Sequence, residues 1–142
     1  QGPHRFIATA QAYDSEMKER IQKHREERDG HWRTVESPIE LAHTIASLNE
    51  GTILIDCCTL WLSNVMLAER DISSETAALI DSIASATPNV VLVSNEVGSG
   101  IVPETKLGRD FRDEQGRLNQ RLAEIADTVE LVVAGIPSRL KG

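Results

Sequence analysis

The fold is decided by a short apolar run that ends in a carboxylate, Thr52-Ile53-Leu54-Ile55-Asp56. A run of this kind predicts a buried strand with a polar group at its carboxyl end. Residues 88–96 repeat the form, because an apolar stretch there is followed by Asn95 and Glu96. Ligands of open parallel sheets bind beyond the carboxyl ends of the strands, so we expect Asp56, Asn95 and Glu96 to lie where chemistry can occur.

The segments on either side of these runs alternate between strand-like and helix-like patterns. We expect strands at residues 5–9, 31–36, 52–56, 88–96 and 129–134, and helices at residues 15–28, 38–48 and 107–126, with two more helical stretches between residues 56 and 88. Ser37, Pro38 and Glu40 form a capping-box pattern that would begin the second helix. Gly135 and Pro137 would end the last strand. The alternation predicts an α/β fold with a mainly parallel sheet and flanking helices.

Size and composition restrict the class of protein. With 142 residues, 40% of them hydrophobic and 26% charged, the chain suits one globular domain over residues 1–142. The net charge of −7 argues against nucleic acid or an anionic membrane as partners, and no stretch approaches the roughly 20 apolar residues of a membrane span. Cys57 and Cys58 are adjacent and lack the spacing of a zinc site, which favours a reducing, cytoplasmic setting. Because the chain does not begin with methionine, we expect residues to precede Gln1.

Asp56 is the first candidate for chemistry. It follows three apolar residues in the pattern of a Walker B strand, whose carboxylate holds Mg²⁺ in P-loop enzymes. The alternative is that Asp56 only caps the turn after the strand.

His24 lies in a basic part of the predicted helix at residues 15–28. Arg20 and Arg28 stand four residues to either side of it, on the same helix face. Their positive charges would lower the pKa of the imidazole, keep the ring neutral and nucleophilic, and attract a triphosphate. The alternative is an ordinary solvated helix face that contains a histidine.

Two further groups have the chemistry to contact a nucleotide. Thr9, Ala10 and Gln11 follow the first strand and offer backbone and side-chain donors, unless they form only a turn. Glu36 would accept hydrogen bonds from N1 and N2 of guanine, a match that adenine lacks. Otherwise Glu36 is a surface residue beside a helix start.

Several linked motifs are similar to those of a known enzyme family. They are Ile7-Ala8-Thr9-Ala10-Gln11, then Arg20-Ile21-Gln22 with His24, then His31-Trp32-Arg33-Thr34 with Glu36, then Leu54-Ile55-Asp56-Cys57 with Thr59, then Val93-Ser94-Asn95-Glu96 up to Pro103, and finally Gly108-Arg109 up to Asn119-Gln120. Together they cover essentially the whole chain. On these motifs the chain resembles the adenosylcobinamide kinase / adenosylcobinamide-phosphate guanylyltransferase family of cobalamin biosynthesis.

The resemblance implies two reactions and the residues for them. The enzyme would phosphorylate the aminopropanol hydroxyl of adenosylcobinamide and then transfer GMP from GTP to the new phosphate, giving adenosylcobinamide-GDP and pyrophosphate. His24 would carry GMP as a covalent intermediate, and Asp56 would hold Mg²⁺, with GTP and ATP as substrates. The nucleotide contacts would come from the positions that match the family's, namely Thr9, Ala10, Gln11, Arg25, Glu26, Glu27, Arg28, Glu36 and Asp56.

The resemblance also implies a RecA-like P-loop NTPase fold and a homotrimer. Family members begin with a strand that leads into GxxxxGK[ST], and no such motif occurs in these 142 residues. We therefore expect the first strand and the P-loop to be absent from this chain. Two alternatives follow: a non-catalytic remnant that forms oligomers or binds the corrinoid, or a generic P-loop NTPase with no corrinoid substrate.

Overall fold

A computed structural model describes residues 3–11, 15–26 and 30–142, and within 15–26 it leaves the side chains of residues 17, 20, 21 and 24–26 undescribed. The chain divides into two compact units, residues 1–95 and 96–142, and each is described by itself. That the whole chain acts as one domain stays a prediction.

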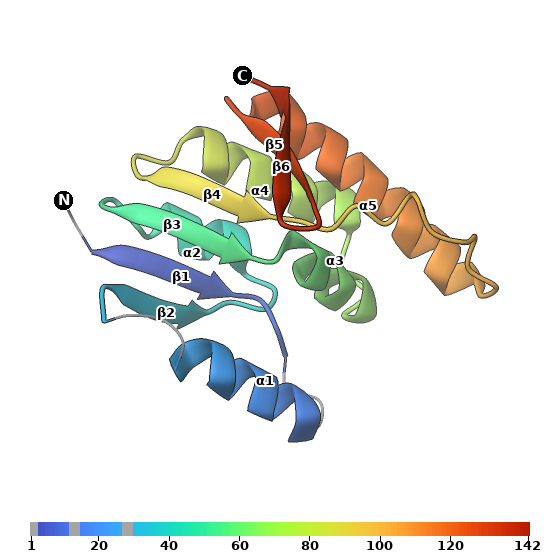
Figure 1. Cartoon of the computed structure of the whole chain (residues 1–142), viewed down its shortest axis with the longest axis horizontal. Coiled ribbons are helices and arrows are strands. Elements are labelled where there is room, and N and C mark those ends of the chain that lie inside the picture. Colours follow the sequence, from blue (N-terminus) through green and yellow to red (C-terminus); the bar gives the residue numbers. More distant parts are fainter. Residues whose placement is uncertain (1–2, 12–14, 27–29) are drawn as a thin grey trace. The chain divides into compact units, whose positions relative to one another are not determined.

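The first unit is a parallel α/β sheet with helical connections (Figure 1). Its elements are β1 (His4–Ala8), α1 (Ser15–Glu26), β2 (Trp32–Glu36), α2 (Leu41–Ala46), β3 (Thr52–Asp56), α3 (Cys58–Leu67), α4 (Ile72–Ala84) and β4 (Asn89–Val93). The strand order is β2-β1-β3-β4, and all three pairings are parallel. The predicted parallel sheet with flanking helices is confirmed, and β3 has the bounds that its apolar run predicted.

Most of the core of this unit lies on one face of the sheet. Ile7 of β1 and Ile53 and Ile55 of β3 are completely buried, since their side chains alternate onto the covered face. Figure 1 shows α2 and α4 on the far side of the sheet. The helices contribute the buried residues Leu41, Ile45, Trp61, Leu62, Val65 and Leu79. Each fully buried aliphatic side chain of this kind contributes about 1.5–3 kcal/mol to folding.

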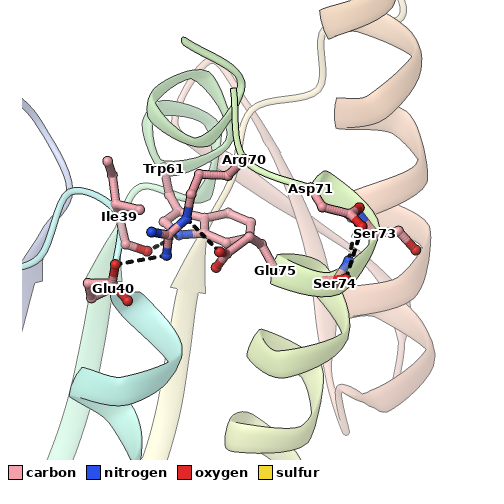
Figure 2. Close-up of polar contacts among 8 residues, drawn as sticks. All are labelled: Ile39, Glu40, Trp61, Arg70, Asp71, Ser73, Ser74 and Glu75. Carbon is pink, nitrogen blue, oxygen red and sulfur yellow. Dashed lines mark hydrogen bonds and ion pairs between the residues drawn. The ribbon is translucent and has the colours of Figure 1, made fainter. Parts of the chain in front are cut away.

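Polar contacts tie the start of α2 to α3 and α4 (Figure 2). The indole Nε1 of Trp61 donates to the carbonyl of Ile39 at 2.8 Å. The guanidinium of Arg70 donates to Glu75 Oε1 at 2.7 Å and to Glu40 Oε1 at 2.8 Å. These hydrogen bonds, first that to Glu75, raise the pKa of Arg70 above its usual value. Because the ion pairs are exposed, their main effect is to fix geometry.

The capping box predicted around Ser37 is wrong. Helix α2 begins only at Leu41, and Glu40 occupies the N-cap position without bonding the described backbone through its side chain. Ser37 is instead buried, and its hydroxyl shares a 2.8 Å hydrogen bond with that of Thr44. The carboxylate of Glu40 pairs with Arg70. Hydrogen bonds to Thr44 and Arg70 therefore occupy both of the side chains that the capping box would use.

The second unit consists of one long helix and a hairpin. Helix α5 spans Lys106–Ile125, and the antiparallel strands β5 and β6 span Val129–Val133 and Ile136–Lys141. The Thr105 hydroxyl caps α5 by accepting from Gly108 N at 3.1 Å. We expected residues 129–134 to be the last strand, and this is wrong, because a further strand, β6, follows and pairs with it. In the described parts of the chain, no helix is both long and apolar enough to cross a membrane.

Candidate functional site

Two of the candidate site residues, Glu36 and Asp56, lie at the edge of the sheet where the parallel strands end. The register pairs Ala8 with Glu36 on one side and with Asp56 on the other. Opposed residues of neighbouring strands project from the same face, so these side chains form one row. Because neighbouring strands lie about 4.8 Å apart, the Cα atoms of Glu36 and Asp56 lie about 10 Å apart across β1. The topology thus brings two exposed carboxylates, distant in sequence, to one edge.

Asp56 is the carboxylate best placed for a cation. It ends β3 with an exposed side chain, and its backbone carbonyl accepts a hydrogen bond from Thr9 N at 3.3 Å. Mg²⁺ is usually held by one or two carboxylates together with substrate phosphates, which a single exposed Asp fits. No three His, Cys, Asp or Glu side chains in the described ranges are close enough to hold a metal ion by themselves. Asp56 therefore suits a cation that arrives with a nucleotide.

Glu36 stands two strands away in the same row. It ends β2 with an exposed side chain, and Ser37, the next residue, donates its backbone N–H to Ala8 O at 2.9 Å. This bond holds the chain to β1 immediately after Glu36. The backbone of Glu36 is therefore held by the β2–β1 pairing before it and by buried Ser37 after it, while its carboxylate is exposed.

Thr9 is fully buried, and its polar groups bond to other parts of the protein. Its hydroxyl donates to the carbonyl of Cys57 at 2.7 Å and accepts from the Cys57 N–H at 2.8 Å. Its own carbonyl accepts from Asn64 Nδ2 at 2.8 Å. The side chain of Thr9 therefore joins the ends of β1 and β3. Ala10 and Gln11 are the partly exposed residues of this loop.

His24 lies on α1, but its side chain is outside the described residues, and so are those of Arg25 and Glu26. Glu27 and Arg28 lie outside the described residues altogether. The nucleophile and the nucleotide contacts predicted for this segment stay predictions.

The two cysteines that follow Asp56 are buried free thiols. Burial, followed by smaller effects of Cys57 and then Asp56, raises the pKa of the Cys58 thiol to about 12. A thiol of this pKa carries almost no thiolate at neutral pH, and the thiolate is the nucleophilic form. Cys58 is therefore a packing residue despite its position beside the candidate site.

Two residues of α3 that the sequence reasoning missed contact the loops of this edge. The side-chain amide of Asn64 donates to the carbonyls of Thr9 and Pro38, and Trp61 donates to Ile39. The available signal was a single amide in the mainly apolar helix α3. That signal predicts a buried polar contact but does not name the partners, which only the fold supplies.

Asn95 and Glu96, expected at this edge, fall in different units. The backbone N–H of Asn95 donates to Thr59 Oγ1 at 2.8 Å, within the first unit. In the second unit, Glu96 Oε1 accepts from Gly98 N at 2.7 Å, so this carboxylate stabilises its own loop.

The chain is similar to known proteins over almost its whole length. The profile of the family described as cobinamide kinase / cobinamide phosphate guanyltransferase matches residues 1–140. The chain is 45% identical to the bifunctional adenosylcobalamin biosynthesis protein CobP of Pseudomonas aeruginosa, over 96% of this chain and 82% of that protein. It is 42% identical to each of the bifunctional adenosylcobalamin biosynthesis proteins CobU of Salmonella typhimurium and Escherichia coli, over 96% of this chain and 84% of those proteins.

Proposed function

Because the chain belongs to the cobinamide kinase / cobinamide phosphate guanyltransferase family, we propose that it phosphorylates adenosylcobinamide and then transfers GMP from GTP to the product. The observation that carries the proposal is the match itself, which spans residues 1–140 and so includes the whole edge formed by the strand ends. The related CobP and CobU proteins are named as bifunctional enzymes of adenosylcobalamin biosynthesis. The fold of the first unit, a parallel sheet with polar residues at its carboxyl edge, suits nucleotide chemistry.

The nucleotide site that we propose follows the row of strand ends. Glu36 accepts hydrogen bonds from N1 and N2 of guanine, and Ala10 and Gln11 contact the nucleotide from the loop after β1. Asp56 holds Mg²⁺, which supplies charge neutralisation to the phosphates when bound. Thr9 supports this site from within, because its hydroxyl fixes the β1 loop against Cys57.

His24 is the nucleophile of the transfer half. Its imidazole nitrogen attacks the α-phosphorus of GTP, the bond to the bridging oxygen breaks, and pyrophosphate leaves. A phosphate oxygen of adenosylcobinamide phosphate then attacks the same phosphorus, the P–N bond breaks, and His24 is regenerated with adenosylcobinamide-GDP as product. Arg25, Glu26, Glu27 and Arg28 contact the nucleotide beside it. This cycle is supported by the basic sequence around His24.

The kinase half and the assembly complete the proposal. ATP or GTP donates the phosphoryl group, on a RecA-like P-loop fold that works in the cytoplasm as a homotrimer. Phosphoryl transfer depends on positioned phosphate-binding groups. GxxxxGK[ST] does not occur in these 142 residues, so product formation tests the kinase half directly.

The experiment is product analysis with adenosylcobinamide, GTP and Mg²⁺. The full-length protein should yield adenosylcobinamide-GDP. The His24→Ala variant should stop at adenosylcobinamide phosphate, while a matched variant of the exposed His43 on α2, His43→Ala, should behave as the wild type. Formation of neither product by the wild type would favour a non-catalytic chain, and nucleotide hydrolysis without corrinoid turnover would favour a generic P-loop NTPase.

A further inference from the structure

Asn64 is a buried polar residue in the mainly apolar helix α3. Only 5% of its surface is exposed. Its Nδ2 donates to the carbonyl of Thr9 at 2.8 Å and to that of Pro38 at 3.0 Å. The two acceptors belong to different loops, one after β1 and one after β2. A single side-chain nitrogen therefore connects the loop that follows Ala8 at the end of β1 with the loop that follows Glu36 at the end of β2.

The position of Asn64 is better explained by this connection than by packing. Burying an amide without partners costs about 1–3 kcal/mol in proteins, whereas a leucine would fill similar space with no such cost. The neighbours Trp61, Leu62 and Val65 on α3 are apolar and fully or almost fully buried, so the helix packs without any need for an amide. What the amide adds is a fixed distance between the carbonyl oxygens of Thr9 and Pro38. Both carbonyl oxygens must lie within hydrogen-bonding range of one nitrogen, so a shift of either loop by about 1 Å breaks a bond.

Neighbouring polar contacts act at the same edge. The Thr9 hydroxyl joins the end of β1 to Cys57 after β3, and Thr59 Oγ1 accepts from the N–H of Asn95 after β4. Cys57 and Thr59, around the start of α3, thus connect the ends of β1, β3 and β4. Asn64 connects the end of β2 to them through Pro38.

We propose that Asn64 is a positioning residue of the nucleotide site. By holding the carbonyls of Thr9 and Pro38 together, it sets the spacing between the Ala10–Gln11 backbone and the Glu36 carboxylate, so that both meet one guanine nucleotide. This role rests on the proposed function, because it acts on the residues assigned there to the nucleotide. Asn64 itself touches no substrate.

The test compares Asn64→Leu with Val65→Ala, a neighbouring change on the same helix. Val65 is completely buried, and its truncation lowers stability without removing a polar contact. In the full-length protein, Asn64→Leu should weaken GTP binding by about tenfold to a hundredfold, because loops that are no longer held must be ordered on binding. Val65→Ala should bind GTP as the wild type does, even if its urea midpoint falls equally.

Hydrogen exchange provides a readout that needs no nucleotide. The amides of Thr9 and Ser37 donate to Asp56 O and Ala8 O, and both should exchange faster in Asn64→Leu than in Val65→Ala. If Asn64→Leu does not fold, Asn64→Ser removes the reach to both carbonyls while keeping a small polar group, and the same results are expected. Wild-type GTP affinity and wild-type exchange at Thr9 and Ser37 in the Asn64 variant would overturn the proposal. If the wild type binds no GTP, the proposed function fails and the positioning role fails with it, and exchange then shows only whether Asn64 holds the two loops together.

Discussion

Replacing Thr9 by valine removes the hydroxyl that joins β1 to β3 and keeps the shape of the side chain. The hydroxyl donates to Cys57 O at 2.7 Å and accepts from Cys57 N at 2.8 Å, and Thr9 is completely buried. In Thr9→Val, the N–H of Cys57 loses its hydrogen-bond partner, whereas the carbonyl of Cys57 keeps the hydrogen bond from Trp61 N at 3.2 Å. Water cannot readily replace the hydroxyl in this buried position.

The size of the effect follows from the two hydrogen bonds that are lost, of which only the one from the Cys57 N–H leaves a group unpaired. The unpaired N–H costs about 1–3 kcal/mol and the weakened carbonyl about 0.5–1.5 kcal/mol, so Thr9→Val should lower the free energy of unfolding by about 1.5–4.5 kcal/mol. Thr9→Ser keeps the hydroxyl and loses one methyl group, which costs about 1 kcal/mol. The valine variant should therefore be less stable than the serine variant by about 0.5–3.5 kcal/mol.

Urea unfolding followed by tryptophan fluorescence measures this difference. Both tryptophans, Trp32 and Trp61, lie in the unit that contains Thr9, and Trp61 is only 1% exposed. The signal therefore reports the unfolding of this unit. The reasoning is refuted if Thr9→Val proves as stable as Thr9→Ser, or more stable.

Three further predictions concern the thiol, a helix cap and the nucleotide site. Since burial raises the pKa of Cys58 to about 12, iodoacetamide at about pH 8 should modify it no faster than the protein unfolds, and fast labelling of the native protein would contradict this. Hydrogen bonds from Ser74 and then Ser73 lower the pKa of Asp71 below 3.8, the ordinary value of an aspartate. The cap therefore stabilises α4 above that pH and loses its effect as pH falls through the lowered pKa, so the difference in urea midpoint between wild type and Asp71→Ala should shrink in acid and not grow. Glu36→Gln should weaken GTP binding by about 1–3 kcal/mol and leave ATP binding unchanged, with Glu50→Gln as the exposed control; equal losses for both nucleotides would argue against guanine recognition.

The fold was predictable where burial dominates the local pattern. The bounds of β3 follow from its run of apolar residues, because both ends of that run coincide with the ends of the buried strand. The start of α2 was not predictable, since Ser37 and Glu40 have the local capping pattern but bond to Thr44 and Arg70. No property of residues 37–40 alone reveals that competition.

Strand β6 was missed because its turn has an unusual sequence. The two residues between β5 and β6, Ala134 and Gly135, have φ angles of 53° and 75°. Two-residue hairpin turns with positive φ at both positions favour Asn-Gly or Asp-Gly, and alanine rarely adopts this conformation. Pro137 also argued against a strand, but an edge strand tolerates proline because the missing N–H need not join a ladder.

The candidate site was predictable only as far as topology allows. Asp56 was chosen because it ends an apolar strand and Glu36 because its carboxylate can accept hydrogen bonds from guanine, and the parallel register places them in one row. The role of Asn64 depends on two carbonyls from distant loops, which no sequence pattern encodes. The chemistry assigned to His24 rests on the sequence, because its side chain is outside the described residues.

Intact-mass spectrometry of the full-length protein after incubation with GTP and Mg²⁺ asks directly whether His24 carries GMP. We predict a mass gain of one GMP that acid removes, as expected for a phosphorus–nitrogen bond to histidine, and that persists in His43→Ala but is absent from His24→Ala. No gain in the wild type, or an undiminished gain in His24→Ala, would contradict guanylyl transfer through this histidine.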